Sequence, residues 1–139
     1  MGIIIDPLLL FVIIIFFSSS LSHKSLLCEA NGGPAVDIVV RNGLNTDLTV
    51  HCKSKDDDIG IRLLHNNDSF LFSFLPNFWG TTLFFCSFQW DKEFHRFDIF
   101  KSSMEVIFDI NLWIVHPNGP CLHDGYAPQK KSYCYPWKP

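Results

Sequence analysis

The sequence predicts an all-β protein, a small antiparallel β-sandwich of about seven or eight short strands that is stabilised by two disulfides. Three observations support this prediction. Short apolar segments alternate with polar residues and are separated by turn residues at intervals of roughly 8–12 residues, which is typical of a sandwich. The chain contains 14 Phe and 4 Trp, residue types that favour strands. Four of its five cysteines, an even set, lie beyond residue 30.

The expected strands are identified from period-2 alternation and β-branched residues between turn signals. They span residues 37–42, 47–53, 61–64, 69–74, 81–88, 94–100, 112–116 and 121–123. We expect the first two to form a hairpin and the apolar strand 81–88 to be buried on both faces. Asn118-Gly119 predicts a hairpin between the last two strands. Residues 101–110 fit a short helix and a strand equally well.

The first thirty residues have the layout of a secretory signal peptide. An apolar run from Pro7 to Phe17 gives way to serines and then to Cys28-Glu29-Ala30. Cleavage after Ala30 would place small residues at positions −3 and −1. The sequence therefore predicts a signal peptide over 1–30 and one small domain over 31–139. Such a protein is secreted and extracellular, and it does not insert into the membrane after cleavage.

Two alternatives at the N-terminus stay open. The region before the apolar run carries Asp6 and no Lys or Arg, and cleavage could instead fall near Ser22. A membrane anchor is the other reading, but the unbroken apolar run is shorter than the about 20 residues that cross a bilayer.

The cysteine count indicates a disulfide framework. Cleavage after Ala30 removes Cys28 and leaves Cys52, Cys86, Cys121 and Cys134. An even set in a small exported protein predicts two disulfides, whose pairing the sequence leaves open among three possibilities. Cleavage near Ser22 would leave Cys28 as a fifth, unpaired thiol.

Charge and motifs argue against several function classes. The formal net charge is −3 and no basic stripe occurs, so we expect no nucleic-acid partner. Nucleophile-elbow, dinucleotide and phosphate-loop motifs are absent, and we expect no enzyme, no catalytic residue and no cofactor. No histidine has zinc-ligand spacing. His116 and His123 could face each other across the Asn118-Gly119 hairpin, but a third ligand is missing, so we expect no metal site.

Two polar loops are candidate sites. Asp56-Asp57-Asp58 does not match a calcium loop, because Ile61 and Asn67 occupy the positions that need glycine and glutamate. The segment is interpreted as a solvated turn. Asn67-Asp68-Ser69 is an N-x-Ser sequon, which predicts a glycan on Asn67 in an exported protein, although a plain turn explains it equally well.

Motifs spread over roughly residues 36–137 carry a family likeness. They are Leu-Thr-Val-His-Cys-Lys-Ser-Lys-Asp-Asp-Asp-Ile-Gly over 48–60, Phe-x-Phe from Phe72, Trp-Gly-Thr-Thr-Leu-Phe-Phe-Cys over 79–86, Trp90, Trp113, Asn-Gly-Pro-Cys over 118–121 and Cys-Tyr-Pro-Trp over 134–137. With these motifs the sequence resembles the plant self-incompatibility protein family, the S-protein homologues.

The resemblance implies a small secreted β-rich protein that is not an enzyme and binds no cofactor. Some family members are pistil-secreted ligands that trigger rejection of self pollen through a pollen-side receptor. Variable surface loops of the family are thought to set recognition, whereas Cys52, Gly80 and Trp113 belong to the scaffold. The matching loop positions in this sequence are Asp56, Asp57, Asp58, Asn66, Asp68 and Asn118.

We therefore expect a monomeric, secreted, disulfide-bonded protein ligand in plant cell–cell signalling, with self-incompatibility-like recognition of a cell-surface receptor. A rigid sandwich can hold variable loops in fixed positions while recognition diverges. The alternative is a secreted defence-type hydrolase or carbohydrate-binding protein, which needs a pocket and exposed aromatic residues. Burial of Trp79, Trp90 and Trp113 would argue against this alternative.

Overall fold

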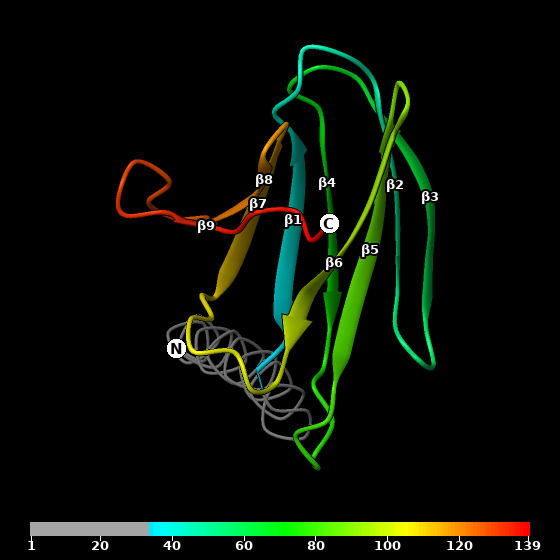
Figure 1. The fold of residues 1–139 in the computed structure, drawn as a ribbon. Helices are drawn as coiled ribbons and strands as arrows, with labels where there is room; N and C mark the ends of the chain where they lie inside the picture. The colour runs from blue at the N-terminus through cyan, green and yellow to red at the C-terminus, as the bar shows by residue number, and fades with distance from the viewer. Residues whose placement is uncertain (1–33) are drawn as a thin grey trace, which may run out of the picture. The chain divides into compact units, whose positions relative to one another are not determined.

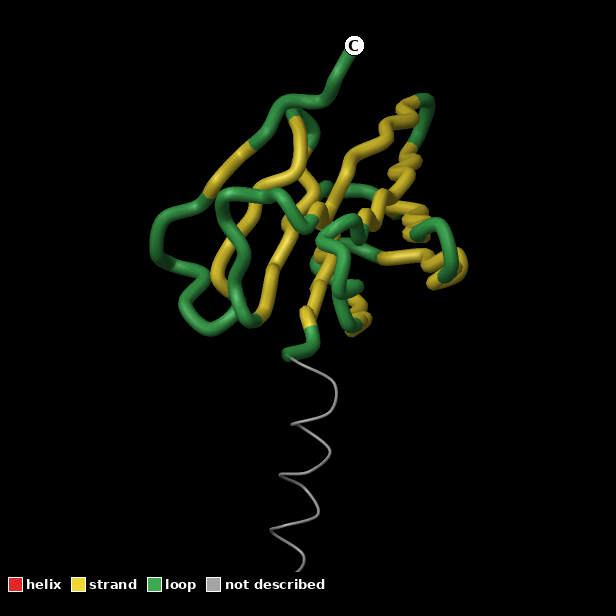
Figure 2. The backbone as a smooth tube through the Cα atoms, turned by 90° about the horizontal axis from the view of Figure 1, so that it is seen from below, coloured by secondary structure: helices red, strands yellow, loops and turns green. Residues whose placement is uncertain are grey.

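The computed structural model describes residues 34–139, which form a β-sandwich of two sheets (Figure 1). One sheet has the order β4 (Ser69–Phe74), β1 (Val36–Asn42), β7 (Ile110–His116), β8 (Gly119–Asp124) and β9 (Tyr133–Cys134). The other has the order β3 (Asp58–Leu64), β2 (Leu48–Lys53), β5 (Leu83–Trp90) and β6 (Glu93–Lys101). This described part contains strands and loops but no helix (Figure 2). The predicted fold class is confirmed, with a short ninth strand in the tail.

The predicted hairpin of the first two strands is wrong. β1 pairs with β4 and, in parallel, with β7, whereas β2 pairs with β3 and β5 in the other sheet. The turn between β1 and β2 therefore crosses from one sheet to the other. The buried Asn42 holds this crossing, because its Nδ2 donates to the carbonyls of Thr46 (2.8 Å) and Leu64 (3.0 Å) and its Oδ1 accepts from Leu44 N (2.8 Å).

The hydrophobic core lies between the two sheets. Alternate residues of each strand point inward, as the period of two requires. Buried side chains from the two sheets join in one cluster that includes Ile38, Val40, Val50, Phe84, Phe88, Trp113, Val115 and Leu122. β5 is buried on one face rather than on both as predicted, because Leu83 and Gln89 are exposed on its outer side. The almost wholly apolar sequence of β5 is typical of a strand that is buried on both faces, but within the described residues no further layer covers the outer side of its sheet.

Residues 102–109 connect β6 to β7 without forming a strand or a helix. Met104, Val106 and Phe108 are half-buried against the core, and the residues between them are exposed. The buried Asn111 side chain accepts a hydrogen bond from Phe108 N and donates one to Phe108 O, both at 2.9 Å. The apolar spacing that left this segment ambiguous therefore belongs to an irregular edge of the core.

Two disulfides join neighbouring strands. Cys52 and Cys86 lie opposite each other on β2 and β5, and they are 34 residues apart in the sequence. Cys121 and Cys134 connect β8 to β9 across 13 residues. The structure thus selects one of the three possible pairings, in which each disulfide stays within one sheet.

The predicted hairpin between β7 and β8 is present, with Pro117 and Asn118 at its turn. His116 and His123 do not face each other, because His116 pairs with Gly119 and His123 pairs with Leu112. Within the described residues no group of three or more His, Cys, Asp or Glu side chains has the arrangement of a metal site. The register of the hairpin therefore does not place His116 and His123 opposite each other, as the sequence had suggested they could be.

The C-terminal tail packs back onto this hairpin. Tyr135 N donates to Pro120 O (3.0 Å), and Trp137 N donates to Asn118 O (3.2 Å). The indole Nε1 of Trp137 donates to Pro117 O (3.0 Å), and its ring stacks on His95 with 4.6 Å between the ring centroids. The disulfide at Cys134 is therefore one of several contacts that hold the tail.

The tail approaches the hairpin closely at Gly119, and a substitution there tests this contact. Its φ of +147° is unfavourable for other residues, and a Cβ there would lie 1.8 Å from the carbonyl oxygen of Tyr135. We expect Gly119→Ala to lower the free energy of unfolding by about 2 kcal/mol and to displace the tail. Urea unfolding measures the first effect, and increased protease cleavage after Lys131 measures the second. Unchanged values for both would show that the tail is not held at this place.

The predicted signal peptide at 1–30 and its cleavage after Ala30 lie outside the described residues. In the part that the structure describes, no helix reaches the length and apolar character needed to span a bilayer.

Candidate functional site

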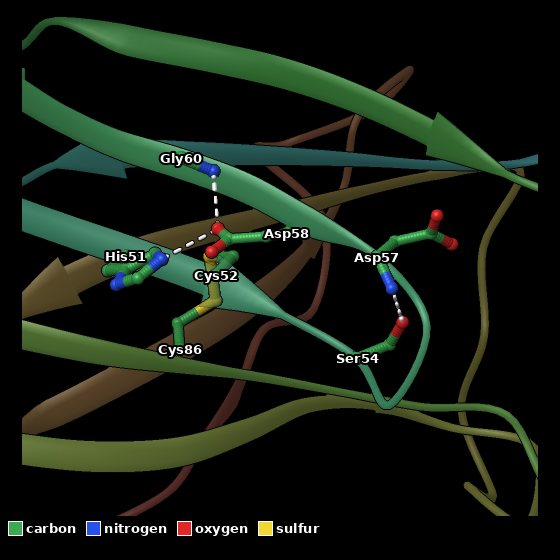
Figure 3. Close-up of polar contacts among 7 residues, drawn as sticks. All are labelled: His51, Cys52, Ser54, Asp57, Asp58, Gly60 and Cys86. Atoms are coloured by element: carbon green, nitrogen blue, oxygen red, sulfur yellow. Dashed lines mark hydrogen bonds and ion pairs between the residues drawn. A yellow bond between two sulfur atoms is a disulfide. The ribbon is translucent and has the colours of Figure 1, made fainter.

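The acidic segment forms the tight turn between β2 and β3. Ser54 N donates to Asp57 O (2.8 Å), and Asp57 N donates to Ser54 Oγ (3.1 Å), so the backbone of the turn is fixed locally. The Asp57 carboxylate points away from the strands (Figure 3). Asp56 and Asp57 are exposed, and within residues 34–139 neither carboxylate accepts a hydrogen bond or forms an ion pair. These two charges are available to a partner.

Asp58 has a different role, because it begins β3 and its carboxylate lies over the strands. Its Oδ1 accepts from Gly60 N (2.8 Å) and contacts Nε2 of His51 on β2 (2.7 Å), as Figure 3 shows. The hydrogen bond from Gly60 N, followed by the contact with His51, lowers the pKa of Asp58 below its ordinary value. Asp58 therefore fixes the start of β3 beside the buried Cys52–Cys86 disulfide, which anchors the turn to the core.

The loop between β4 and β5 lies at the same end of the sandwich and displays two aromatic side chains. Phe78 is 94% exposed and Trp79 is 81% exposed, and their rings meet edge to face with 5.6 Å between centroids. Asn77 holds the loop in shape, since its Oδ1 accepts from Thr81 N and its Nδ2 donates to Thr81 Oγ1, both at 2.9 Å. The backbone N of Asn77 also donates to Thr82 Oγ1 (2.7 Å).

A groove of about 920 Å³ separates the two loops. Asp56 and Asp57 border it from the β2–β3 turn, and Leu75 and Trp79 border it from the β4–β5 loop. The remaining lining residues include serines and threonines but no histidine or cysteine. The groove thus has an acidic side and an apolar, aromatic side.

The other predicted recognition residues lie at the opposite end of the sandwich (Figure 1). Asn66 and Asp68 are in the loop after β3, where Asp68 Oδ2 accepts from His65 N (3.0 Å). Asn67 is exposed, with φ of +67°, and its backbone N donates to Asn42 O (3.0 Å). Asn118 is in the β7–β8 turn at this same end. The six residues named from the sequence therefore form two separate groups and not one site.

His65 forms an exposed pair with Asp47 at this end, with 2.9 Å between His65 Nδ1 and Asp47 Oδ1. The hydrogen bond from Asp47, followed by its charge, raises the pKa of His65 above 6.5. A raised histidine pKa contributes stability below 6.5 that is lost as the pH rises through the folded value. The lowered pKa of Asp58 contributes stability above 3.8 that is lost as the pH falls through the folded value.

We therefore expect the His65–Asp47 pair and the contacts of Asp58 both to contribute fully to the stability of the fold between about pH 4 and pH 6.5. The effect should be small, because exposed charged groups interact weakly. Proton NMR titration of His65 should give a pKa above that of a model peptide, and Asp47→Asn should bring it back down. A His65 pKa that Asp47→Asn leaves unchanged would contradict this assignment.

Sequence reasoning did not single out Phe78, and it named Trp79 only as part of the family motif over 79–86 and as a residue whose burial would argue against the alternative function. A signal was present, since the two aromatic residues stand between Pro76 and Gly80 in a loop and not in an alternating strand. Gly80 has φ of +71°, which suits glycine. Trp90 and Trp113 are buried as a scaffold role requires, whereas Trp79 is not.

The fold defines the chain as a small disulfide-bonded β-sandwich with organised loops at its ends. The family model of the plant self-incompatibility protein S1 matches residues 37–137. The chain therefore belongs to this family, as the resemblance of its motifs predicts.

Relatives agree with this assignment. S-protein homolog 5 of Arabidopsis thaliana is 47% identical over 92 residues, covering 66% of this chain and 68% of the relative. S-protein homolog 2 of Arabidopsis thaliana is 38% identical over 148 residues, covering 92% and 91%. Neither relative is named as an enzyme.

A solved structure shares the fold, with a TM-score of 0.55 and 19% identity over 78% of this chain and 98% of the other. It is described as a self-incompatibility protein homologue from a widespread family of small, highly stable, secreted plant proteins.

Proposed function

We propose that this protein is a secreted, monomeric ligand that binds a cell-surface receptor protein in plant cell–cell signalling. Membership in the self-incompatibility family and the signal-like layout of residues 1–30 support export. The observation that carries the proposal is the exposed aromatic pair Phe78-Trp79 on a loop that is fixed by its own hydrogen bonds. Preorganised aromatic residues at a surface are typical of protein interfaces.

Binding and not catalysis is proposed for the groove beside this pair. Its lining contains no histidine and no cysteine, so it offers no Ser–His or Cys–His nucleophile–base pair. Asp58 is held by His51 and Gly60, and it is therefore committed to the structure of the turn. The exposed Trp79 also favours a second candidate, a carbohydrate-binding protein, because sugars stack on exposed aromatic rings.

The experiment uses the protein recovered from the medium of plant cells that express the full chain. Its labelled form is titrated onto plasma-membrane vesicles from several plant tissues, and onto the same vesicles after protease treatment. We expect saturable binding to vesicles of at least one tissue that protease treatment abolishes. Background binding to all vesicles, or absence of the protein from the medium, would contradict the proposal. Binding that survives protease treatment and is displaced by cell-wall polysaccharide would favour the carbohydrate-binding candidate.

We also propose that Asn67 of the secreted protein carries an N-linked glycan. Its side chain is exposed in the β3–β4 loop, and Ser69 of the sequon is exposed at the start of β4. Mass spectrometry of the peptide that contains Asn67 should show a glycan mass in the wild type. Ser69→Ala removes the sequon without changing the positive φ of Asn67, and it should remove that mass. An unmodified Asn67 peptide from the wild-type protein would refute the proposal.

A further inference from the structure

We infer that Phe78, Trp79 and the acidic β2–β3 turn form one docking surface, and that its occupant is a receptor protein with an apolar pocket rimmed by lysine or arginine side chains. This inference rests on the proposed receptor-binding function and specifies its contact site and the chemistry of its partner. This docking surface consists of Phe78, Trp79, Asp56 and Asp57.

The exposure of the aromatic pair is the first step. Phe78 and Trp79 are the two most exposed large apolar side chains in the described part of the chain. The core of the same sandwich buries other aromatic residues, among them Phe84, Phe88 and Trp113, almost completely. Tryptophan is enriched among the few residues that dominate binding energy at protein interfaces. The aromatic pair is therefore suited to enter a pocket on a partner.

The rigidity of the loop is the second step. Three hydrogen bonds close the loop around the pair: Asn77 donates to Thr81 Oγ1 and Thr82 Oγ1 and accepts from Thr81 N. Gly80 allows the positive φ that the turn requires. Behind the neighbouring turn, the buried Cys52–Cys86 disulfide joins β2 to β5. A surface that is already ordered loses little conformational entropy on binding, which raises affinity for a given contact area.

Charge decides the chemistry of the partner. Asp56 and Asp57 border the same groove as Trp79, and Lys55 is the only cation in that lining. The Asp58 carboxylate is already occupied by Gly60 N and His51, whereas those of Asp56 and Asp57 have no partner within residues 34–139. The groove is therefore net negative, and complementarity requires a positively charged rim on the partner. The same sign of charge disfavours anionic lipid headgroups as the occupant.

The test compares matched variants of the secreted protein on protease-sensitive plasma-membrane vesicles and on protein-free vesicles of phosphatidylcholine and phosphatidylserine. Trp79→Ala should weaken binding to the plasma-membrane vesicles by about 30-fold, the loss expected for an interface hot spot. Phe94→Ala is the matched control, because Phe94 is 58% exposed on β6 and lies outside the groove. It should bind as the wild type does. Equal unfolding midpoints of wild type and both variants show that all are folded.

The charge arm uses the double variant Asp56→Asn and Asp57→Asn, with Asp91→Asn at the opposite end of β5 as its control. The Asp57 carboxylate makes no bond in the turn, so the double variant should keep the fold. Raising the salt from about 0.05 to about 0.5 M should weaken the wild type and the Asp91→Asn variant, while the double variant should start weaker and change less.

The outcomes distinguish a failure of the docking surface from a failure of the proposed ligand function. Wild-type binding that Trp79→Ala leaves unchanged, or that Phe94→Ala weakens as much, overturns the docking surface and leaves the ligand function standing. Equal salt dependence of the wild type and the double aspartate variant overturns the positively charged partner. Trp79-dependent binding to the protein-free vesicles would show that the occupant is a lipid surface. Absence of wild-type binding to any plasma-membrane vesicle contradicts the ligand function and this inference together.

Discussion

Replacing both Cys52 and Cys86 with alanine is expected to lower the free energy of unfolding by about 4 kcal/mol. The disulfide closes a loop of 34 residues, and loop-closure entropy of the unfolded chain gives this magnitude. Small domains are stabilised by only about 5–15 kcal/mol in total, so this loss is a large share of the stability of the protein. Urea unfolding monitored by tryptophan fluorescence measures the change.

The second disulfide provides the comparison. Its sequence separation of 13 residues predicts a smaller loss of about 3 kcal/mol for the double variant Cys121→Ala and Cys134→Ala. Cys134 is exposed, whereas Cys52 and Cys86 are fully buried. The Cys121–Cys134 bond should therefore be reduced first by a mild thiol, and the Cys52–Cys86 bond only when the sandwich opens. A Cys52/Cys86 variant as stable as the wild type would show that this disulfide does not support the fold.

Trp113→Ala should lower the free energy of unfolding by about 3–5 kcal/mol, because it removes the largest fully buried side chain of the described residues and leaves a cavity. The ring contacts Phe97 (5.3 Å between centroids) and Tyr135 (5.9 Å). It therefore joins β7 in one sheet to β6 in the other and to the tail. Chemical denaturation gives the free energy, and the tail should become more accessible to protease in the same variant.

The indole nitrogen of Trp113 adds a sharper comparison. Nε1 is buried and finds no hydrogen-bond partner within residues 34–139. A buried unpaired donor costs about 1–3 kcal/mol, so Trp113→Phe, which removes that donor and keeps most of the ring, should cost only about 1 kcal/mol. If Trp113→Phe is as damaging as Trp113→Ala, the nitrogen makes a bond that stabilises the fold.

The strands could be predicted from the sequence because alternation with a period of two is a local signal. Strand pairing could not, because the decisive contacts join residues that are far apart. The turn after β1 is polar, as in a hairpin, but the buried Asn42 side chain bonds Leu64 O, 22 residues away, and directs the chain into the other sheet. The parallel pairing of β1 with β7 likewise joins Asp37 to Ile110. Local patterns contain no information on such partners.

The candidate site could be predicted only in part, because the roles of its residues also depend on contacts that form after folding. The acidic turn is visible in the sequence, but the different roles of Asp57 and Asp58 depend on the positions of His51 and Gly60 after folding. Trp79 lies in a loop between Pro76 and Gly80, whereas Trp113 lies within the apolar strand β7, and the fold leaves the first ring 81% exposed and the second 1% exposed. A residue between a proline and a glycine in a loop deserves a different prediction from one within an alternating strand.

The central claim is that an exported, disulfide-bonded sandwich presents a fixed recognition surface. The most direct test is non-reducing peptide mapping of the protein purified from the extracellular fluid of the plant. We predict a mature N-terminus after Ala30, one peptide pair joined through Cys52 and Cys86, and a second joined through Cys121 and Cys134. Free thiols at these four cysteines, a different pairing, or a retained apolar segment from Pro7 to Phe17 would contradict the claim.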